Sequence, residues 1–393
     1  MANHTLLIVG GTLQQGGAER IISVLSEKFL EYFAEVKIAL WREAPVFYTV
    51  TEKIEIVSVP KWSGEKSVMR QMVWFRKYVK RLKPDAVLSF LAPFNMLSLV
   101  SLAGTGIPVY IASRSDPHYD APNRWWRWVR DGIYHLADGI SVQSDGNKEY
   151  FSKYLRKKVS VIYNPVFIRS ELVGKALETP KELVIVSVGR LNRVKNQVLL
   201  LEVFQEIHRL YPDYRLVIYG EGDYREVLER KIRDLQLGAC VSLPGACADV
   251  LTRILPAEIF VMTSDYEGMS NALIEAMVLG LPVISTRVSG AVDIIRDGEN
   301  GRLVDVRDAE GVKAALIEWL EHKEKAQACA REGIKLADRL QLKIIVQEWL
   351  RFMKMDIKNK ERICKTLLLP EEPDLSVPIC VRPWWGRGMK YVV

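Results

Sequence analysis

Residues 257–286 read AEIFVMTSDYEGMSNALIEAMVLGLPVIST and alternate two apolar runs with a helical pattern. This stretch predicts a buried strand at 257–264, a loop, a helix that Ser270 or Asn271 can cap, and a second apolar strand at 281–286. A strand, a helix and a strand in this order form the βαβ unit of a parallel sheet. Glu275 stands inside the otherwise apolar run of the helix, where a charge is costly unless it is paired or faces a cleft.

The same alternation extends through most of the chain. In the first half, helical patterns such as 18–33, 68–82 and 125–136 separate apolar runs at 6–9, 36–40, 54–57, 86–91, 109–112, 139–142 and 159–162. The pattern stops at 163–182, which holds two prolines, and resumes with runs at 182–189, 214–220 and 240–245. The sequence therefore predicts an α/β protein with two doubly wound parallel sheets, whose ligands bind in a cleft at the carboxyl ends of the strands.

We expect five parts along the chain. They are a first doubly wound domain (1–163), a linker (164–182), a second doubly wound domain (183–340), a helix that packs back on the first domain (341–358) and a tail (359–393). The tail holds four prolines and fits neither sheet, so it is interpreted as disordered or as an interaction segment.

Composition narrows the class of protein. With 393 residues, 49% of them hydrophobic and 26% charged, the chain is globular and long enough for two cores. Its five scattered cysteines form neither a zinc motif nor a disulfide framework, and no signal peptide or uninterrupted membrane span is present, which indicates a cytoplasmic protein. The net charge of +7 admits nucleotides, lipid headgroups or nucleic acid as anionic partners.

Glycine and charge occur together at three predicted strand ends. The first is IVGGTLQQGGAER (8–20), where Gly16 and Gly17 can bring backbone amides close to an anion at a helix N-terminus. The alternative is an ordinary tight turn between a strand and a helix, because the spacing matches no phosphate-binding motif.

The second strand end is SVGRLNRVKNQ (187–197), and the third is IYGEGDYREVL (218–228). Arg190 and Lys195 would form a pyrophosphate clamp, or they are two solvated surface cations. Gly220 and Gly222 open a helix and fit close contact with a nucleotide.

Two carboxylates follow the strand at 257–264. Glu275, one turn inside the next helix, can accept hydrogen bonds from two vicinal hydroxyls of a ligand. Glu267 can reach a different hydroxyl-bearing ring. The alternative for Glu275 is a buried carboxylate paired with an arginine.

These residues together resemble a known family. Glu267 and Glu275 form the E-x₇-E motif of the retaining glycosyltransferases of family 4 (glycosyl transferases group 1), of the type that builds bacterial polysaccharides and lipid-linked glycans. The segments GGAER, GRL, YGEG, EAMVLGLPVI and DGENGRLV follow in the family's order, and the resemblance covers residues 5–350. It implies a GT-B fold, with two Rossmann-like domains facing a central cleft. In such a fold the first domain (1–163) would bind the acceptor and the second (183–340) the nucleotide-sugar.

The resemblance also implies a site for a nucleotide-sugar donor, expected to be a UDP-sugar. The donor-binding positions that it implies are Gly16, Gly17, Gly189, Arg190, Lys195, Gly220, Gly222, Glu267, Gly268, Met269, Ser270, Asn271 and Glu275. In this assignment Arg190 and Lys195 neutralise the diphosphate, Glu275 binds the ribose and Glu267 holds the donor sugar.

The expected chemistry is transfer of a hexose or N-acetylhexosamine with retention, without a metal or other cofactor. Arg190, Lys195 and a helix N-terminus can stabilise charge on the leaving diphosphate, and no acidic pair at a strand end calls for Mg²⁺. Attack on the same face of the sugar makes Glu267 a positioning group, while a double displacement stays open. His118, beside Arg114 and Asp116, is a further catalytic candidate or a satisfied loop histidine.

Two segments of the first domain mix cations with large aromatic residues, RQMVWFRKYVKRLK (70–83) and NRWWRWVRDGIYH (123–135). Core packing with a solvated basic face explains the first segment, whereas Trp125, Trp126 and Trp128 are hard to bury together. We therefore expect peripheral binding to the anionic inner face of the cell membrane, and a polyprenyl-linked or lipopolysaccharide-type glycan as acceptor. The alternatives are a soluble enzyme acting on a small molecule or glucan and a nucleotide-sugar epimerase. A nucleic-acid partner has only the basic pI of about 9.0 in its favour.

Overall fold

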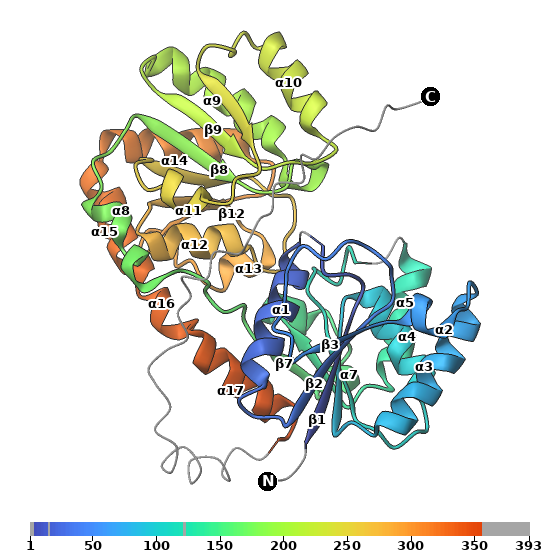
Figure 1. The fold of residues 1–393 in the computed structure, drawn as a ribbon. Coiled ribbons are helices and arrows are strands. Elements are labelled where there is room, and N and C mark those ends of the chain that lie inside the picture. The colour runs from blue at the N-terminus through green and yellow to red at the C-terminus, as the bar shows by residue number, and fades with distance from the viewer. Residues whose placement is uncertain (1–3, 15, 121–122, 356–393) are drawn as a thin grey trace, which may run out of the picture.

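The computed structural model describes residues 4–14, 16–120 and 123–355. It shows two α/β domains, one above the other in Figure 1. The predicted tail, the end of the predicted last helix, and Cys364 and Cys380 lie outside the described residues.

The first domain contains a seven-stranded parallel sheet in the order β3-β2-β1-β4-β5-β6-β7. Its strands are β1 (Thr5–Gly10), β2 (Glu35–Leu40), β3 (Glu55–Ser58), β4 (Ala86–Phe90), β5 (Val109–Ala112), β6 (Gly139–Val142) and β7 (Val159–Val161). Each lies within one or two residues of the run predicted from the sequence. Buried runs such as the five residues of β4 are typical of strands that are covered on both faces.

The second domain contains a six-stranded parallel sheet in the order β10-β9-β8-β11-β12-β13. Its strands are β8 (Val184–Val188), β9 (Arg215–Tyr219), β10 (Val241–Gly245), β11 (Ile259–Met262), β12 (Val283–Thr286) and β13 (Arg302–Val304). The sequence did not predict β13, which is only three residues long. The expected fold, two doubly wound parallel sheets, is confirmed.

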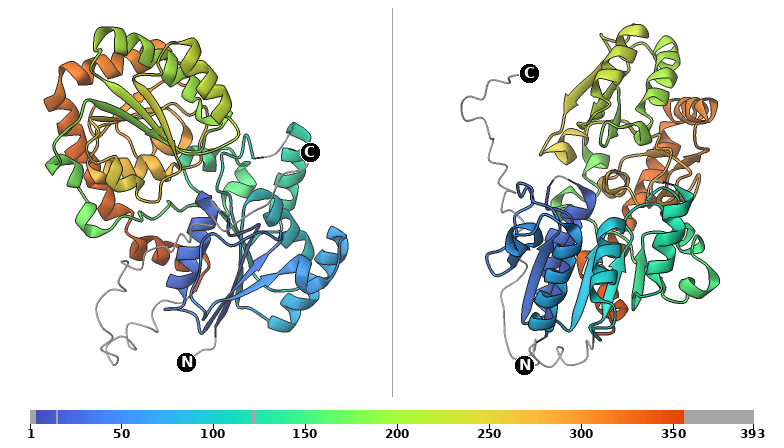
Figure 2. Two further views of the ribbon diagram at one scale, coloured as in Figure 1. Left: turned by 45° about the horizontal axis from the view of Figure 1, so that its top comes forward. Right: turned by 90° about the vertical axis from the view of Figure 1, so that its right-hand side faces the viewer.

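Helices cover both faces of each sheet (Figure 2). In the first domain they are α1 (Gly17–Phe29), α2 (Val59–Ser63), α3 (Val68–Leu82), α4 (Ala92–Leu102), α5 (Arg124–Tyr134), α6 (Asp145–Glu149) and α7 (Lys153–Arg156). Those that follow are α8 (Lys175–Glu178), α9 (Gln197–Leu210), α10 (Arg225–Asp234), α11 (Val250–Arg253), α12 (Asn271–Leu279), α13 (Ser289–Val292), α14 (Ala309–Glu321), α15 (Lys323–Ile334), α16 (Leu336–Arg339) and α17 (Leu342–Phe352). The 3₁₀ turns are η1 (Ser170–Leu172) and η2 (Arg193–Lys195). None of the described helices is long and apolar enough to cross a bilayer.

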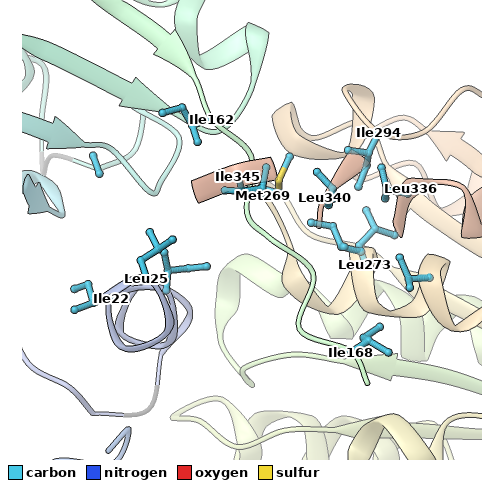
Figure 3. Packing of buried hydrophobic residues seen from close by; sticks show 14 of the residues in the cluster. Ile22, Leu25, Ile162, Ile168, Met269, Leu273, Ile294, Leu336, Leu340 and Ile345 are labelled. Atoms are coloured by element: carbon cyan, nitrogen blue, oxygen red, sulfur yellow. The ribbon is translucent and has the colours of Figure 1, made fainter. Parts of the chain in front are cut away.

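A single apolar cluster runs through the junction of the two domains. Figure 3 shows Ile22 and Leu25 of α1, Ile168 of the connecting segment and Leu273 of α12 among its members. The predicted linker is not wholly irregular, because it contains the short helix α8. Ala176 of this helix belongs to the same apolar cluster. The amide of Gly174, which precedes α8, donates to the Val278 carbonyl of α12 at 2.9 Å.

The chain returns to the first domain at its end. In Figure 1 the red helix α17 leaves the second domain and lies against the first. Trp349 is fully buried and its ring centroid lies 5.9 Å from that of Phe90. Phe352 packs 5.3 Å from Tyr110, and a β-carbon on Gly139 would lie 2.8 Å from the Phe352 ring, so a side chain at this position would have to displace that ring. The two domains are therefore joined by two crossings of the chain.

Candidate active site

The loop after β11 carries Glu267 and is fastened on two sides. The Thr286 hydroxyl donates to the Ser264 carbonyl at 2.6 Å, and the Asp265 amide donates to the Val194 carbonyl at 2.8 Å. Within this frame the ammonium group of Lys195 pairs directly with Glu267, and both side chains are 18% exposed. Lys195, which was predicted to face a diphosphate, therefore neutralises Glu267 in the structure.

Helix α12 begins after Ser270, whose hydroxyl accepts from the Leu273 amide at 3.5 Å, and it buries Glu275. The Glu275 carboxylate accepts from Nη1 of Arg20 at 2.8 Å. Burial raises the pKa of Glu275, and the nearby positive charge of Arg20 opposes this rise. The structure thus shows the buried, arginine-paired carboxylate that the sequence offered as an alternative to a ribose site.

The partner of Glu275 comes from the other domain. Arg20 lies on the first turn of α1, directly after Glu19 and three residues after Gly17. A β-carbon on Gly17 would lie 3.6 Å from the side-chain nitrogen of Asn271, so α1 and α12 begin side by side. The N-termini of α1 and α12 thus meet at the junction of the domains. Because helix N-termini favour anions, this place is suited to a negatively charged ligand.

A carboxylate of the protein already lies at the start of α1. The Glu19 side chain folds back onto Gly16, where a β-carbon would overlap it. Burial raises the pKa of Glu19, while its own backbone amide and the positive charge of Arg190 lower it. Arg190 of the second domain therefore faces this helix start.

Gly189, Gly220 and Gly222 have a packing role. A β-carbon on Gly220 would overlap the Gly189 carbonyl, and one on Gly222 would overlap the Leu191 carbonyl. The two strand-end loops can approach this closely only because glycine has no side chain. The exposed Arg190 is presented by this pair of loops, and its carbonyl accepts from the Gln197 side chain at 3.1 Å. Contact of these glycines with a donor stays a prediction.

His118 lies at the same junction, on the loop after β5. Its Nδ1 is 2.9 Å from Asp116 Oδ1, and its ring packs at 4.6 Å against Tyr150. The other carboxylate oxygen of Asp116 accepts from Ser289 of the second domain at 3.1 Å. One ring nitrogen is thus occupied, but 53% of the side chain remains exposed, which fits both interpretations of His118.

Several residues at this junction were missed by sequence reasoning. Asn164 donates to Asn271 at 2.8 Å and accepts from Gln143 at 2.7 Å, which ties the first domain to the start of α12. Tyr119 stacks on Tyr266, with centroids 4.1 Å apart and an interplanar angle of 12°. Asn164 belongs to the predicted linker (164–182), and no pattern in the sequence pairs the two tyrosines.

Two protein-family models match the chain. Glycosyltransferase Family 4 matches residues 15–168 and Glycosyl transferases group 1 matches residues 169–336, so together they span both domains. The chain belongs to the GT-B glycosyltransferases.

Relatives of this glycosyltransferase include two enzymes of Campylobacter jejuni. One is named as the α-1,4-N-acetyl-D-galactosaminyltransferase for GalNAc-α-(1→4)-GalNAc-α-(1→3)-diNAcBac-PP-undecaprenol, and it is 26% identical over 88% of this chain and 97% of its own length. The other, named as N-acetylgalactosamine-N,N′-diacetylbacillosaminyl-diphospho-undecaprenol 4-α-N-acetylgalactosaminyltransferase, is 29% identical over 83% and 95%. Anabaena HepE, solved in complex with UDP and glucose, has the same fold with a TM-score of 0.72 at 16% identity, covering 89% of this chain and 99% of that one.

The glycosyltransferase therefore brings most of its predicted site residues to one junction between the carboxyl ends of two sheets. The two carboxylates of the E-x₇-E motif lie there, each paired with a cation, Glu267 with Lys195 and Glu275 with Arg20. Within the part of the chain that the structure describes, no three His, Cys, Asp or Glu side chains gather as a metal site.

The packing of Gly290 allows a first test of this geometry. Gly290 of α13 lies against the Glu267 loop, and a β-carbon on it would overlap the Gly268 carbonyl and lie 2.6 Å from Met269 Cα. The Gly290→Ala variant of the glycosyltransferase is expected to displace the loop, to lower stability by about 1–3 kcal/mol and to weaken nucleotide-sugar binding about tenfold or more. Calorimetric titration measures the binding. The matched control is Gly238→Ala, where a β-carbon meets nothing within 4 Å; equal affinity in both variants would contradict the prediction.

Proposed function

We propose that this glycosyltransferase moves a hexose or N-acetylhexosamine from a UDP-sugar to a lipid-linked glycan, with retention and without a metal, in the synthesis of cell-surface polysaccharide or lipopolysaccharide. The observation that carries the proposal is the position of Glu267 and Glu275. They lie on either side of the start of α12, within the junction of the two domains, and each is held by a cation.

The proposed reaction follows from the charges at this junction. When the anomeric C–O bond of the donor breaks, negative charge develops on the leaving diphosphate. Arg190, Lys195 and the amides at the starts of α1 and α12 are the groups that would stabilise it. The acceptor hydroxyl attacks the anomeric carbon on the same face, and its proton passes to the leaving phosphate oxygen.

Glu267 has a positioning role in this scheme. Because its carboxylate is paired with Lys195, it is a weaker nucleophile than a free carboxylate. We therefore assign it to the hydroxyls of the donor sugar, with Lys195 shared between this carboxylate and the diphosphate. A covalent sugar adduct on Glu267 would replace this scheme with a double displacement.

The nature of the substrates is supported by the relatives. The names of the two Campylobacter enzymes contain undecaprenol-linked diphosphate acceptors and N-acetylgalactosamine, and HepE was solved with UDP and glucose. A UDP-hexose or UDP-N-acetylhexosamine donor and a polyprenyl-diphosphate-linked acceptor are therefore the first substrates to assay.

The test is a transfer assay with purified full-length protein. UDP-glucose, UDP-galactose, UDP-N-acetylglucosamine and UDP-N-acetylgalactosamine are each incubated with a polyprenyl-diphosphate-linked glycan, with and without EDTA. We expect one of these donors to give a product whose linkage NMR identifies as α. The rate of transfer should be the same with and without EDTA. Conversion of donor without acceptor would indicate an epimerase instead, and efficient transfer to a water-soluble glucan would indicate a soluble enzyme.

The proposal includes contact of α5 with an anionic membrane. Trp125, Trp126 and Trp128 are 62%, 43% and 76% exposed, next to the exposed Arg124. Exposed tryptophans beside cations are typical of surfaces that insert at lipid headgroups. The Trp125/Trp126→Ser double variant is expected to lose most of its co-sedimentation with phosphatidylglycerol vesicles.

The matched control for this surface is Leu210→Ser, which removes an apolar side chain that is 61% exposed on the second domain. It is expected to sediment with vesicles as the wild type does. Unchanged sedimentation of the tryptophan variant would remove the membrane from the proposal and leave the transfer reaction untouched.

A further inference from the structure

We propose that Arg20 is a positioning residue for the donor: it reaches from the first domain, holds one carboxylate oxygen of Glu275 and leaves the other oxygen for a ribose hydroxyl. The inference rests on the proposed function, because Glu275 binds a ribose only if the protein binds a nucleotide-sugar.

The contact is a specific pair within the junction. Nη1 of Arg20 donates to Oε1 of Glu275 at 2.8 Å, across 255 residues of sequence. The side chains are 25% and 10% exposed, so solvent screens the pair less than it would screen a surface ion pair. Glu275 otherwise lies among seven consecutive buried residues of α12, Leu273 to Leu279, which form about two turns.

The second oxygen of the carboxylate is the one proposed for the ligand. Among the described residues no donor reaches Oε2 of Glu275, and the side chain keeps 10% of its surface open. An ionised carboxylate accepts stronger hydrogen bonds than a neutral carboxyl group. A cation fixed on Oε1 thus orients the group, and its charge opposes the rise that burial causes in the pKa of Glu275, which favours the ionised form for a hydroxyl at Oε2.

Arg20 is itself anchored by the segment that joins the domains. Its Nη2 donates to the Phe167 carbonyl at 3.4 Å, and its guanidinium lies 4.8 Å from the centroid of the Phe167 ring. It is therefore held in place before any ligand arrives. Arg20 belongs to α1 of the first domain, and Glu275 belongs to α12 of the second. The Glu275 carboxylate is therefore oriented only when the two domains lie together.

The titratable neighbours of this pair are acidic. Glu19 lies in the same turn as Arg20, and Tyr48 of the segment after β2 is close enough to feel the charges of Arg20, Glu19 and Glu275. Burial raises the pKa of Tyr48, which is therefore neutral near pH 7. Arg190 opposes the charge of Glu19 from the second domain. The cation that acts on Glu275 is thus Arg20.

The consequence is a defined pH dependence. Burial raises the pKa of Glu275 and Arg20 lowers it, so removal of Arg20 raises this pKa further. The carboxylate then takes up a proton at a higher pH on acidification, and ribose binding is lost at that higher pH. Arg20→Lys keeps the charge and should retain most of the effect.

The experiment is calorimetric titration of the full-length protein with UDP between pH 5 and pH 9. We expect Arg20→Gln to weaken UDP binding about tenfold at pH 7 and to move its acid limb upward, and Arg20→Lys to stay within a few-fold of wild type. Glu275→Gln should bind UDP weakly and lack this acid limb. The control is Arg81→Gln, an exposed arginine on α3, which should match wild type.

Each other outcome is decisive. If wild type binds UDP and Glu275→Gln loses it while Arg20→Gln binds as wild type at every pH, the inference about Arg20 is wrong and the proposed function stands. Tighter binding by Arg20→Gln would show that Arg20 competes with the ribose, which also overturns it. The inference is also overturned if Arg20→Gln loses UDP binding equally at every pH, if Arg20→Lys does not restore it and if the unfolding temperature falls. That result would indicate a structural role. If wild type binds no UDP, or Glu275→Gln binds it normally, the UDP site of the proposed function fails and the inference fails with it.

Discussion

Replacement of Lys195 by methionine is expected to lower kcat by about two to three orders of magnitude and to change the Kd of the donor only a few-fold. Lys195 sits at the end of η2, where Asn192 caps the turn by accepting from the Lys195 amide at 3.1 Å, and its ammonium group reaches Glu267. In the proposed reaction negative charge grows on the diphosphate only as the C–O bond breaks. A fixed cation at that place therefore stabilises the transition state more than the bound donor.

The measurement is steady-state kinetics with saturating acceptor, together with direct titration of the donor. Arg193→Met removes an exposed cation from the same turn and should leave both constants unchanged. If Lys195→Met instead raised KM and kept kcat, the lysine would serve ground-state binding alone, and the charge would have to be stabilised by Arg190 and the helix starts.

Replacement of Arg130 by methionine is expected to destabilise the first domain by about 3–5 kcal/mol. Arg130 is 1% exposed and pairs with Asp120 and Asp131, while donating to the Pro117 carbonyl at 2.8 Å and the Tyr150 hydroxyl at 2.7 Å. Its loss leaves two carboxylates without their buried cation, and a partly desolvated charge without a partner is costly.

The loss is best followed by hydrogen exchange of peptides from β5 and β6, because a whole-protein transition would mix two domains. Arg124→Met changes an exposed arginine of the same helix and should leave exchange unaltered. Arg130 also holds the ends of the His118 loop, so the variant should lose transfer activity with the loop. Unchanged exchange in β5 would contradict this account.

The fold could be predicted closely because its signals are local. Apolar runs of four to eight residues, separated by helical periods, marked strands such as β4 and β11 within two residues of their ends. The misses have the same origin. β13 has three residues and α8 has four, so each is too short to show a strand or helix period in the sequence. β13 depends on pairing with β12, and α8 on packing against α12.

The candidate site could be predicted in part. Glu267 and Lys195 were found because they follow predicted strands, and Glu275 because it is a charge inside an apolar helix. Their roles as ligands of a donor remain predictions. Their partners were not found. Arg20 stood in a quoted motif, yet nothing local links it to a carboxylate 255 residues away. Such pairs arise only when two sheets face each other in three dimensions.

Helix α17 makes the first domain discontinuous along the gene. The face of the sheet that holds Phe90, Tyr110 and Gly139 is completed by Trp349 and Phe352. During co-translational folding this face must stay uncovered while the whole second domain is synthesised, and it closes only when the last described helix leaves the ribosome. A fragment cut after β7 would present it to solvent, so the domain boundary seen in space gives no cutting point for expression of the first domain alone.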